Sequence, residues 1–381
     1  MSKTVVIIPA LDPDERLIEY CEDLLRKHGG PIVLVDDGSS NEKQSIFDRL
    51  AKKDGIIVIH HPYNLGKGRA LKNSFAQVAI WSGMDVSDYE LSEGIRVDYG
   101  SEENIGELFA GAMGVITADS DGQHSVKDVI AISEEIAKGA SELVLGARDF
   151  DSDNVPARSE TGNKITRFLF RLLYRTRLVD TQTGLRGVSM DLIPTYLQCK
   201  GERFEFELDM LIVSARTKIP MKEIPIETIY ENANEGTHFR TIVDSCAVYR
   251  VLFGPFLLYL ISSVTSFVID ILIFQVALLI LAFAPEGSRI YASTIVARVV
   301  SSIYNYLINK KLVFGKEGDG AKTAVGYYLL VIVQMFMSGS LVLLVHKILP
   351  IPETVIKVMV DTLLFVVSFQ VQKRIIFRKK D

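Results

Sequence analysis

Several features that would place a protein in a common class are scarce in this chain. The three cysteines, Cys21, Cys199 and Cys246, have neither disulfide nor metal-site spacing, so we expect reduced thiols in a cytoplasmic environment. The formal net charge of -5 is small for 381 residues and argues against a nucleic-acid partner. We expect no signal peptide, because residues 1–4 lead directly into a strand-like run.

Hydrophobic residues make up 48% of the chain, and their excess lies almost entirely beyond Gly254. A helix of ~20 predominantly apolar residues is long enough to cross a bilayer. Four stretches meet that requirement, at residues 256–284, 290–314, 325–349 and 351–371. We therefore expect residues 256–381 to form an all-α domain of four transmembrane helices. A juxtamembrane interfacial helix is expected over residues 241–255.

The first 240 residues alternate between short apolar runs and amphipathic segments. The apolar runs lie at residues 4–9, 32–35, 56–59, 115–117 and 142–146. This alternation predicts an α/β domain over residues 1–240 with a doubly wound sheet of parallel strands. Residues 82–112 are acidic and rich in turn-forming residues, and we expect them to form an inserted surface hairpin or flap.

Polar side chains accumulate directly after successive predicted strands. They belong to Asp12, Asp36, Asp37, Lys67, Arg69, Asp119 and Asp121. Open α/β sheets bind ligands at the carboxyl ends of their strands, so these side chains should converge on one edge. Taken alone, residues 36–39 also fit a turn with a helix cap, and residues 66–68 fail the Walker spacing. The agreement among four strand ends favours a shared binding site.

Two carboxylates follow the predicted strand at residues 115–117. Asp119 and Asp121 are two residues apart, so they point to the same side of an extended segment. With the amide oxygen of Gln123 they form an all-oxygen set that suits Mg²⁺ or Mn²⁺. An acidic loop that caps the next helix is the alternative. The polar groups after the other strands favour the metal site.

Four segments together resemble the signature of glycosyltransferase family 2, whose members have a Rossmann-like GT-A nucleotide-sugar domain. They are Pro9-Ala10, Val35-Asp36-Asp37-Gly38-Ser39, Asn64-Leu65-Gly66-Lys67-Gly68-Arg69-Ala70 and Asp119-Ser120-Asp121-Gly122-Gln123-His124. The resemblance implies a UDP- or GDP-sugar donor whose nucleotide contacts Pro9, Ala10, Leu11, Asp36, Asp37, Lys67, Asp119 and Ser120. It also implies that Asp119, Asp121 and Gln123 hold Mg²⁺ or Mn²⁺ on the donor diphosphate.

Residues 180–187 and 204–208 resemble the acceptor side of polyprenyl-phosphate sugar transferases. The resemblance implies undecaprenyl or dolichyl phosphate as the acceptor. Since guanidinium groups bind phosphate with bidentate geometry, the candidates for binding it are Arg148, Arg158 and Arg240. The expected catalytic residues are Asp119, Asp121, Arg148 and Arg158. The Gln-x-x-Arg-Trp motif of processive synthases is absent, because Trp81 is the only tryptophan, which argues against polymerisation.

Residues 256–381 resemble the GtrA-like family of four-span membrane proteins, and residues 305–314 weakly repeat in residues 368–377. Basic residues follow the second and fourth predicted spans, among them Lys310, Lys311, Lys373 and Arg374. Positive charge favours the cytoplasmic side. We therefore expect a multi-pass protein of the cell membrane with both termini and the catalytic domain in the cytoplasm.

Four ionisable residues lie inside the predicted spans, namely Asp270, Arg298, Lys357 and Asp361. Such residues are costly in a membrane, usually face the interior of the bundle and are candidates for function. Asp270 with Arg298 is the preferred pair. A structural ion pair, or snorkelling toward the membrane surface, is the alternative, especially for Lys357.

Together these patterns and resemblances predict a metal-dependent transfer of a sugar from a nucleotide-sugar to a polyprenyl phosphate in cell envelope glycosylation. The resemblance to family 2 implies that the transfer inverts the anomeric carbon. Two alternatives stay open. The membrane half translocates the lipid-linked sugar, or the enzyme glycosylates another lipid-linked glycan or a protein. The sequence does not identify the sugar, and it is compatible with an oligomer.

Overall fold

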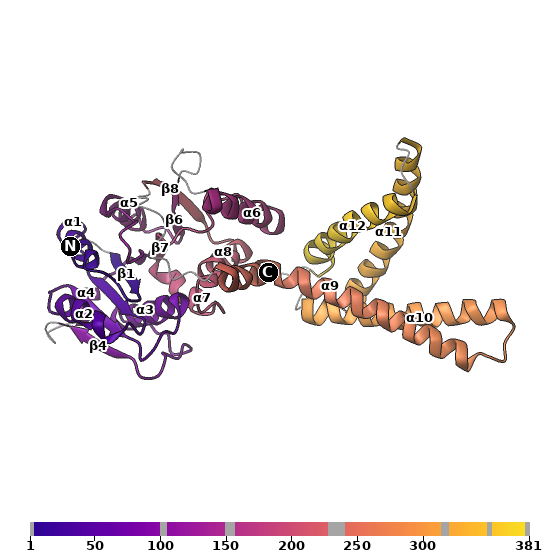
Figure 1. The fold of residues 1–381 in the computed structure, drawn as a ribbon, viewed down its shortest axis with the longest axis horizontal. Helices are drawn as coiled ribbons and strands as arrows, with labels where there is room; N and C mark the ends of the chain where they lie inside the picture. Colours follow the sequence, from indigo (N-terminus) through magenta and orange to yellow (C-terminus); the bar gives the residue numbers. More distant parts are fainter. Residues whose placement is uncertain are drawn as a thin grey trace. The chain divides into compact units, whose positions relative to one another are not determined.

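The computed structural model describes residues 4–99, 105–148, 157–227, 241–313, 320–348 and 353–377 (Figure 1). The chain divides into two compact units, Met1–Leu252 and Phe253–Asp381. The boundary falls inside one long helix, α9 (Thr241–Ile280).

The first unit contains an eight-stranded sheet with the order β4-β3-β2-β1-β5-β7-β6-β8. The strands are β1 (Thr4–Ala10), β2 (Ile32–Asp36), β3 (Ile56–His60), β4 (Arg96–Tyr99), β5 (Gly114–Thr117), β6 (Leu143–Arg148), β7 (Arg186–Ser189) and β8 (Met221–Ile226). The predicted α/β architecture is confirmed. The expectation of parallel strands throughout is wrong, since β4 and β7 run antiparallel to their neighbours. β7 starts beside the carboxyl end of β6, so it runs back between β5 and β6.

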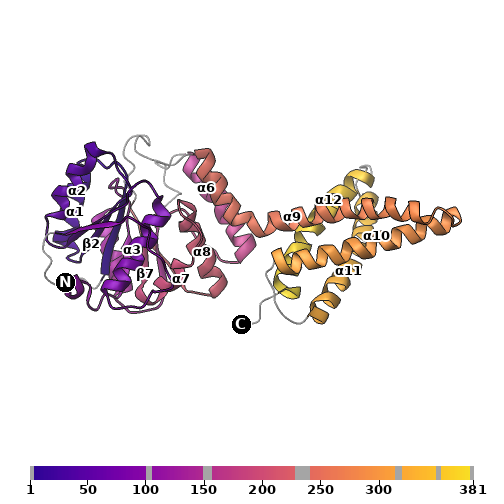
Figure 2. The same cartoon turned by 90° about the horizontal axis from the view of Figure 1, so that it is seen from below.

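Helices cover both faces of this sheet (Figure 2). The helices of this unit are α1 (Arg16–Lys27), α2 (Gln44–Ala51), α3 (Lys67–Trp81), α4 (Ile105–Phe109), α5 (Val126–Ile136), α6 (Ala157–Tyr174), α7 (Ile193–Leu197) and α8 (Glu205–Thr217). Successive strand residues point to opposite faces of a sheet. Ile8 and Leu34 pack in one core with α1, α2 and α5. On the other face, α3 contacts β1 and β2, and it also contacts α7 and α8.

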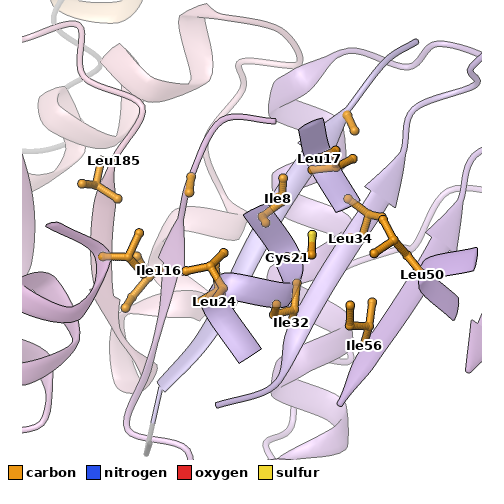
Figure 3. Packing of buried hydrophobic residues seen from close by; sticks show 14 of the residues in the cluster. Ile8, Leu17, Cys21, Leu24, Ile32, Leu34, Leu50, Ile56, Ile116 and Leu185 are labelled. Carbon is orange, nitrogen blue, oxygen red and sulfur yellow. The ribbon is translucent and has the colours of Figure 1, made fainter. Parts of the chain in front are cut away.

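Figure 3 shows the core between α1 and the sheet. Leu17, Cys21 and Leu24 of α1 are fully buried with Ile8 and Ile32 of the strands. Full burial of one large aliphatic side chain stabilises a fold by about 1.5–3 kcal/mol. This packing fixes the strands in one layer, so that the polar residues after β1, β2, β3 and β5 share one edge.

The segment predicted to be a surface hairpin or flap instead extends the sheet. Within it, β4 pairs antiparallel with β3, where Val97 lies opposite Ile59. The short helix α4 carries Phe109, whose ring stacks on Trp81 of α3 with 4.9 Å between ring centroids. The insertion therefore packs against the edge of the sheet and against α3.

The second unit contains α9, α10 (Glu286–Ile308), α11 (Gly320–Ile348) and α12 (Glu353–Val371). The helix expected at residues 241–255 is not separate, because α9 is continuous from Thr241. Among the described residues, one stretch is long and apolar enough to cross a membrane, namely Phe256–Ile280 with a mean hydropathy of 2.2. Four membrane crossings remain a prediction.

The internal repeat of the second unit is visible in its contacts. α10 and α12 both end in π-helical turns, Asn309–Val313 and Gln372–Ile376, at equivalent positions of the repeat. The equivalent residues meet, since Asn309 Nδ2 donates to Gln372 Oε1 at 3.2 Å. Ser262 of α9 donates to Asn309 Oδ1 at 2.6 Å. Buried amides and hydroxyls thus join the two halves of this unit.

The packing of the sheet predicts the cost of truncating a core side chain. Ile32→Ala should lower the free energy of unfolding by about 2–5 kcal/mol, because Ile32 is fully buried and a cavity would remain. Ile80→Ala removes the same atoms from a side chain that is 46% exposed and should cost less than about 1 kcal/mol. Chemical denaturation followed by the fluorescence of Trp81, the single tryptophan, measures both. Equal denaturation midpoints for Ile32→Ala and Ile80→Ala would contradict the described packing of Ile32.

Candidate functional site

A cleft of about 520 Å³ opens at the carboxyl ends of the parallel strands in the first unit. Its walls come from the segments after β1, β2, β3 and β5 and from the start of α8. The lining residues are Pro9, Ala10, Leu11, Asp12, Pro13, Asp14, Arg16, Asp37, Asn64, Gly66, Lys67, Asp119, Ser120, Asp121, Arg203 and Phe204. The structure therefore brings together the strand ends singled out in the sequence.

Asp36 is the one expected nucleotide-binding residue that does not line the cleft. Its side chain is buried, and its oxygens accept hydrogen bonds from the Ser39 N–H at 2.8 Å, Gln44 Nε2 at 2.9 Å and His60 Nδ1 at 2.9 Å. Burial alone would raise the pKa of Asp36, but these hydrogen bonds outweigh it and lower the pKa to about 2. Asp36 is therefore an ionised anchor for the turn after β2.

Asp37 lines the cleft and fastens the loop after β3. Its carboxylate accepts the backbone N–H groups of Leu65 and Gly66, both at 2.9 Å, and His61 Nδ1 at 2.7 Å. The turn also requires Gly38, whose φ is +76° and whose Cβ, if present, would lie 2.3 Å from the backbone carbon of Tyr63. Asp37 thus positions the loop that leads into Lys67.

Lys67, the first residue of α3, is largely buried between two carboxylates. Its Nζ lies 2.6 Å from Asp119 Oδ1 and 2.8 Å from Glu207 Oε1 of α8. Burial would lower the pKa of Lys67, but the charges of Asp119 and Glu207 outweigh it and raise the pKa. Glu207 was not among the site residues predicted from the sequence. It appeared there only as part of the segment 204–208, which resembles the acceptor side of polyprenyl-phosphate sugar transferases.

Asp119 and Asp121 differ in their surroundings. Asp119 Oδ2 lies 3.2 Å from His124 Nε2, while Lys67 holds the other oxygen. Burial would raise the pKa of Asp119, but Lys67 and His124 together hold it well below its usual range. For Asp121, burial and then the charge of Asp119 raise the pKa, although its carboxylate accepts the Gln123 N–H at 3.1 Å.

The carboxylate of Asp121 is suited to bind a divalent cation. In the described part of the chain, no basic side chain forms an ion pair with Asp121, so a cation would supply the missing positive charge. Both oxygens of Asp119 already contact Lys67 and His124. Among the residues that the structure describes, no three His, Cys, Asp or Glu side chains form a cluster that could hold a metal ion. Oxygens of a bound ligand would have to complete the coordination.

The arginines expected at the acceptor phosphate are only partly described. Arg148, at the end of β6, donates from Nε and Nη2 to the buried carboxylate of Asp180 at 2.6 and 3.1 Å. Arg240 and the side chain of Arg158 lie outside the described residues. The sequence analysis missed Arg186, which is fully buried and donates to the carbonyl oxygens of Thr183 and Glu207.

One of the four ionisable residues in the predicted spans is described. Asp270 of α9 accepts a hydrogen bond from Ser301 Oγ of α10 at 2.8 Å. The side chains of the other three, Arg298, Lys357 and Asp361, lie outside the described residues. The pairing of Asp270 with Arg298 therefore stays a prediction.

Known families match part of the first unit and most of the second. Residues 5–79 match the family model of glycosyl transferase family 2, and residues 256–377 match that of the GtrA/DPMS transmembrane domain. The protein is a glycosyltransferase, with a family 2 match in its first unit and a GtrA-type transmembrane match in its second. This glycosyltransferase is therefore a membrane protein.

Two curated archaeal proteins are similar to this glycosyltransferase. An uncharacterized protein of Methanocaldococcus jannaschii is 28% identical over 242 residues, which cover 62% of this chain and 86% of that protein. A UDP-N-acetylglucosamine–dolichyl-phosphate N-acetylglucosaminyltransferase of Methanococcus voltae is 26% identical over 265 residues, which cover 65% of this chain and 94% of that protein.

Solved structures with some similarity include two other proteins. Glucosyl-3-phosphoglycerate synthase from Mycobacterium tuberculosis, in complex with Mn²⁺, UDP and glucosyl-3-phosphoglycerate, is 15% identical with a TM-score of 0.44. The match covers 66% of this chain and 78% of that one. TarS of S. aureus, residues 1–349, is 13% identical with a TM-score of 0.37, and the match covers 83% and 93% of the two chains.

The pKa shifts of the two cleft carboxylates predict opposite effects of amide substitutions. Because the pKa of Asp121 is raised, the stability linked to this group is present below the ordinary pKa of about 4 and lost as the pH rises. Asp121→Asn should therefore raise the melting temperature at pH 7. Asp119→Asn should lower stability by about 2 kcal/mol, because Lys67 loses a largely buried partner.

Differential scanning fluorimetry in EDTA measures both effects at pH 7. The gain from Asp121→Asn should shrink as the pH falls toward 4, where the wild-type carboxyl group is increasingly protonated. A melting temperature of Asp121→Asn below that of the wild type at pH 7 would contradict the described environment of Asp121.

Proposed function

We propose that this glycosyltransferase transfers a sugar from a UDP- or GDP-sugar to a membrane polyprenyl phosphate, undecaprenyl or dolichyl phosphate. The observation that carries the proposal is the meeting of Lys67, Asp119 and Asp121 in a cleft of a family 2 domain joined to a GtrA-type membrane domain. The Methanococcus voltae relative is named for UDP-N-acetylglucosamine and dolichyl phosphate. That pair is therefore the first to test.

The cleft offers separate surfaces for the parts of a nucleotide-sugar. Pro9, Ala10 and Leu11 form an apolar wall at the end of β1 that suits the base and ribose. Lys67 lines the cleft, and its ammonium group would contact the diphosphate. Asp121, with Asp119 and Gln123 as further candidates, would hold Mg²⁺ or Mn²⁺. When bound, that cation would neutralise charge on the departing diphosphate.

The acceptor that we propose needs positioning rather than activation. A phosphate monoester has a second pKa near ~6, so it is largely a dianion at neutral pH and requires no general base. Arg148 lies at the carboxyl end of β6, where Asp180 holds its guanidinium group in one orientation. With Arg158 and Arg240 it would place a phosphate oxygen for direct displacement, which inverts the anomeric carbon.

The proposal also includes the placement of the chain in the membrane. Residues 1–240 would form the catalytic domain, and residues 256–381 would cross the membrane four times. Basic residues at the ends of α10 and α12 support a cytoplasmic position for those ends. Both termini and the catalytic domain would then lie in the cytoplasm.

A transfer assay on the purified full-length protein tests the proposal. We expect a lipid product from radiolabelled UDP-N-acetylglucosamine, or from another UDP- or GDP-sugar, with short-chain dolichyl or undecaprenyl phosphate. The product should require Mg²⁺ or Mn²⁺ and should be labile to mild acid. Asp121→Asn should reduce its formation by about 100-fold or more while the protein stays folded, because the cation loses its carboxylate.

Asp54→Asn is the matched control, because Asp54 is an exposed carboxylate outside the cleft and the loss of its charge should leave the rate unchanged. Metal-independent transfer, or a wild-type rate for Asp121→Asn, would overturn the metal assignment. Donor binding without any lipid product would instead favour a different acceptor, such as a lipid-linked glycan or a protein.

Movement of the lipid-linked sugar across the membrane is a second candidate function. The observation in its favour is the internal repeat, in which α10 and α12 end in equivalent π-helical turns and Asn309 contacts Gln372. Paired repeats of this kind are common in transporters. A proteoliposome assay of lipid-linked sugar on the two leaflets tests it. Retention of all product on the side of synthesis would exclude it.

A further inference from the structure

We propose that Tyr89, in the insertion between α3 and β5, is a positioning residue for the donor cleft. Its hydroxyl group connects to two walls of the cleft, the loop after β3 and the loop before α8. Among the described residues of the insertion, none lines the cleft itself, so the effect would be indirect. This inference rests on the proposed binding of a nucleotide-sugar in the cleft.

The first connection runs from Tyr89 through α3 to Asp37. The Tyr89 hydroxyl donates to Asn73 Oδ1 at 3.0 Å, and Asn73 Nδ2 lies 3.0 Å from His61 Nε2. His61 Nδ1 lies 2.7 Å from Asp37 Oδ1. Because an ionised carboxylate can only accept, His61 carries a proton on Nδ1 and accepts at Nε2. Each donor therefore points from Tyr89 toward Asp37.

Every interior member of this connection is shielded from solvent. The side chains of His61 and Asn73 are buried, and Asp37 is 4% exposed. Ser92, a second residue of the insertion, accepts a hydrogen bond from Asn73 Nδ2 at 3.0 Å. At the far end, Asp37 accepts the N–H groups of Leu65 and Gly66, next to Lys67. The amide of Asn73 thus links the insertion to the loop that presents the ammonium group.

The second connection runs from Tyr89 to the opposite wall. Arg69 Nη1 donates to the Tyr89 hydroxyl at 3.2 Å, and its Nε and Nη2 donate to the carboxylate of Glu202 at 2.6 and 2.7 Å. The Arg69 N–H also donates to the Glu202 carbonyl oxygen at 2.9 Å. Glu202 directly precedes Arg203 and Phe204, which line the cleft.

The Tyr89 hydroxyl group therefore connects to both walls of the cleft, because it donates to Asn73 and accepts from Arg69. Burial raises the pKa of Tyr89, which keeps the hydroxyl protonated as this arrangement requires. Phenylalanine would keep the ring near Arg69 but would leave Asn73 Oδ1 and Arg69 Nη1 without this partner. We expect the loops that hold the donor to lose their fixed separation.

Tyr89→Phe in the full-length protein tests this inference. The dissociation constant for the nucleotide-sugar that serves as donor should rise about tenfold, as should its KM, since a buried polar group loses its partner. The KM for polyprenyl phosphate should stay unchanged and kcat should change less than about twofold. A general loss of folding would affect donor and acceptor alike.

Tyr99→Phe is the matched control. Tyr99 lies in β4 of the same insertion, and its hydroxyl makes no hydrogen bond within the described ranges. It should bind donor like the wild type. Wild-type donor affinity in Tyr89→Phe, or the same loss in both variants, would overturn the inference while leaving the proposed function intact. If the wild type binds no UDP- or GDP-sugar, the proposed function fails and the inference fails with it.

Discussion

The ammonium group of Lys67 connects the parts of the chain that form the cleft. It lies 2.6 Å from Asp119 at the end of β5 and 2.8 Å from Glu207 of α8, so one charge joins two segments far apart in sequence. Without it, two carboxylates would share a poorly solvated space, and one would tend to take up a proton. Two glycines permit this approach. A Cβ at Gly66 would lie 2.6 Å from the Glu202 carbonyl oxygen, and one at Gly184 would lie 2.5 Å from Asp119 Oδ2.

The cleft could be located from the sequence because parallel strands end at a common edge. Pro9, Asp37, Lys67 and Asp119 each follow an apolar run, and the structure brings all four into one lining. Asp36 could not be assigned in this way. Its partners Gln44 and His60 come from other segments, and they turn its carboxylate into the interior.

Glu207 and Arg186 escaped the sequence analysis for a related reason. Arg186 is the first residue of β7, a four-residue strand that enters the sheet antiparallel between β5 and β6. Glu207 of α8 meets Lys67 of α3, which is far from it in sequence. Four residues carry too little periodicity to reveal direction, so the direction of β7 and of β4 depends on pairing between distant segments. In the membrane unit, composition revealed the helices, but it could not reveal that α9 continues without a break from Thr241.

Helix α3 explains how an insertion distant from the cleft is linked to its walls. Lys67 opens the helix, Arg69 and Asn73 follow within two turns, and the rise from Lys67 to Asn73 is about 9 Å. A helix of this length is stiff, so contacts made at Asn73 constrain the orientation of its first turn. The insertion pairs β4 with β3 and stacks Phe109 on Trp81 at the other end of α3. The insertion thus contacts α3 at its middle, through Asn73, and at its end, through Trp81. Both contacts constrain the orientation of α3 and therefore the position of Lys67.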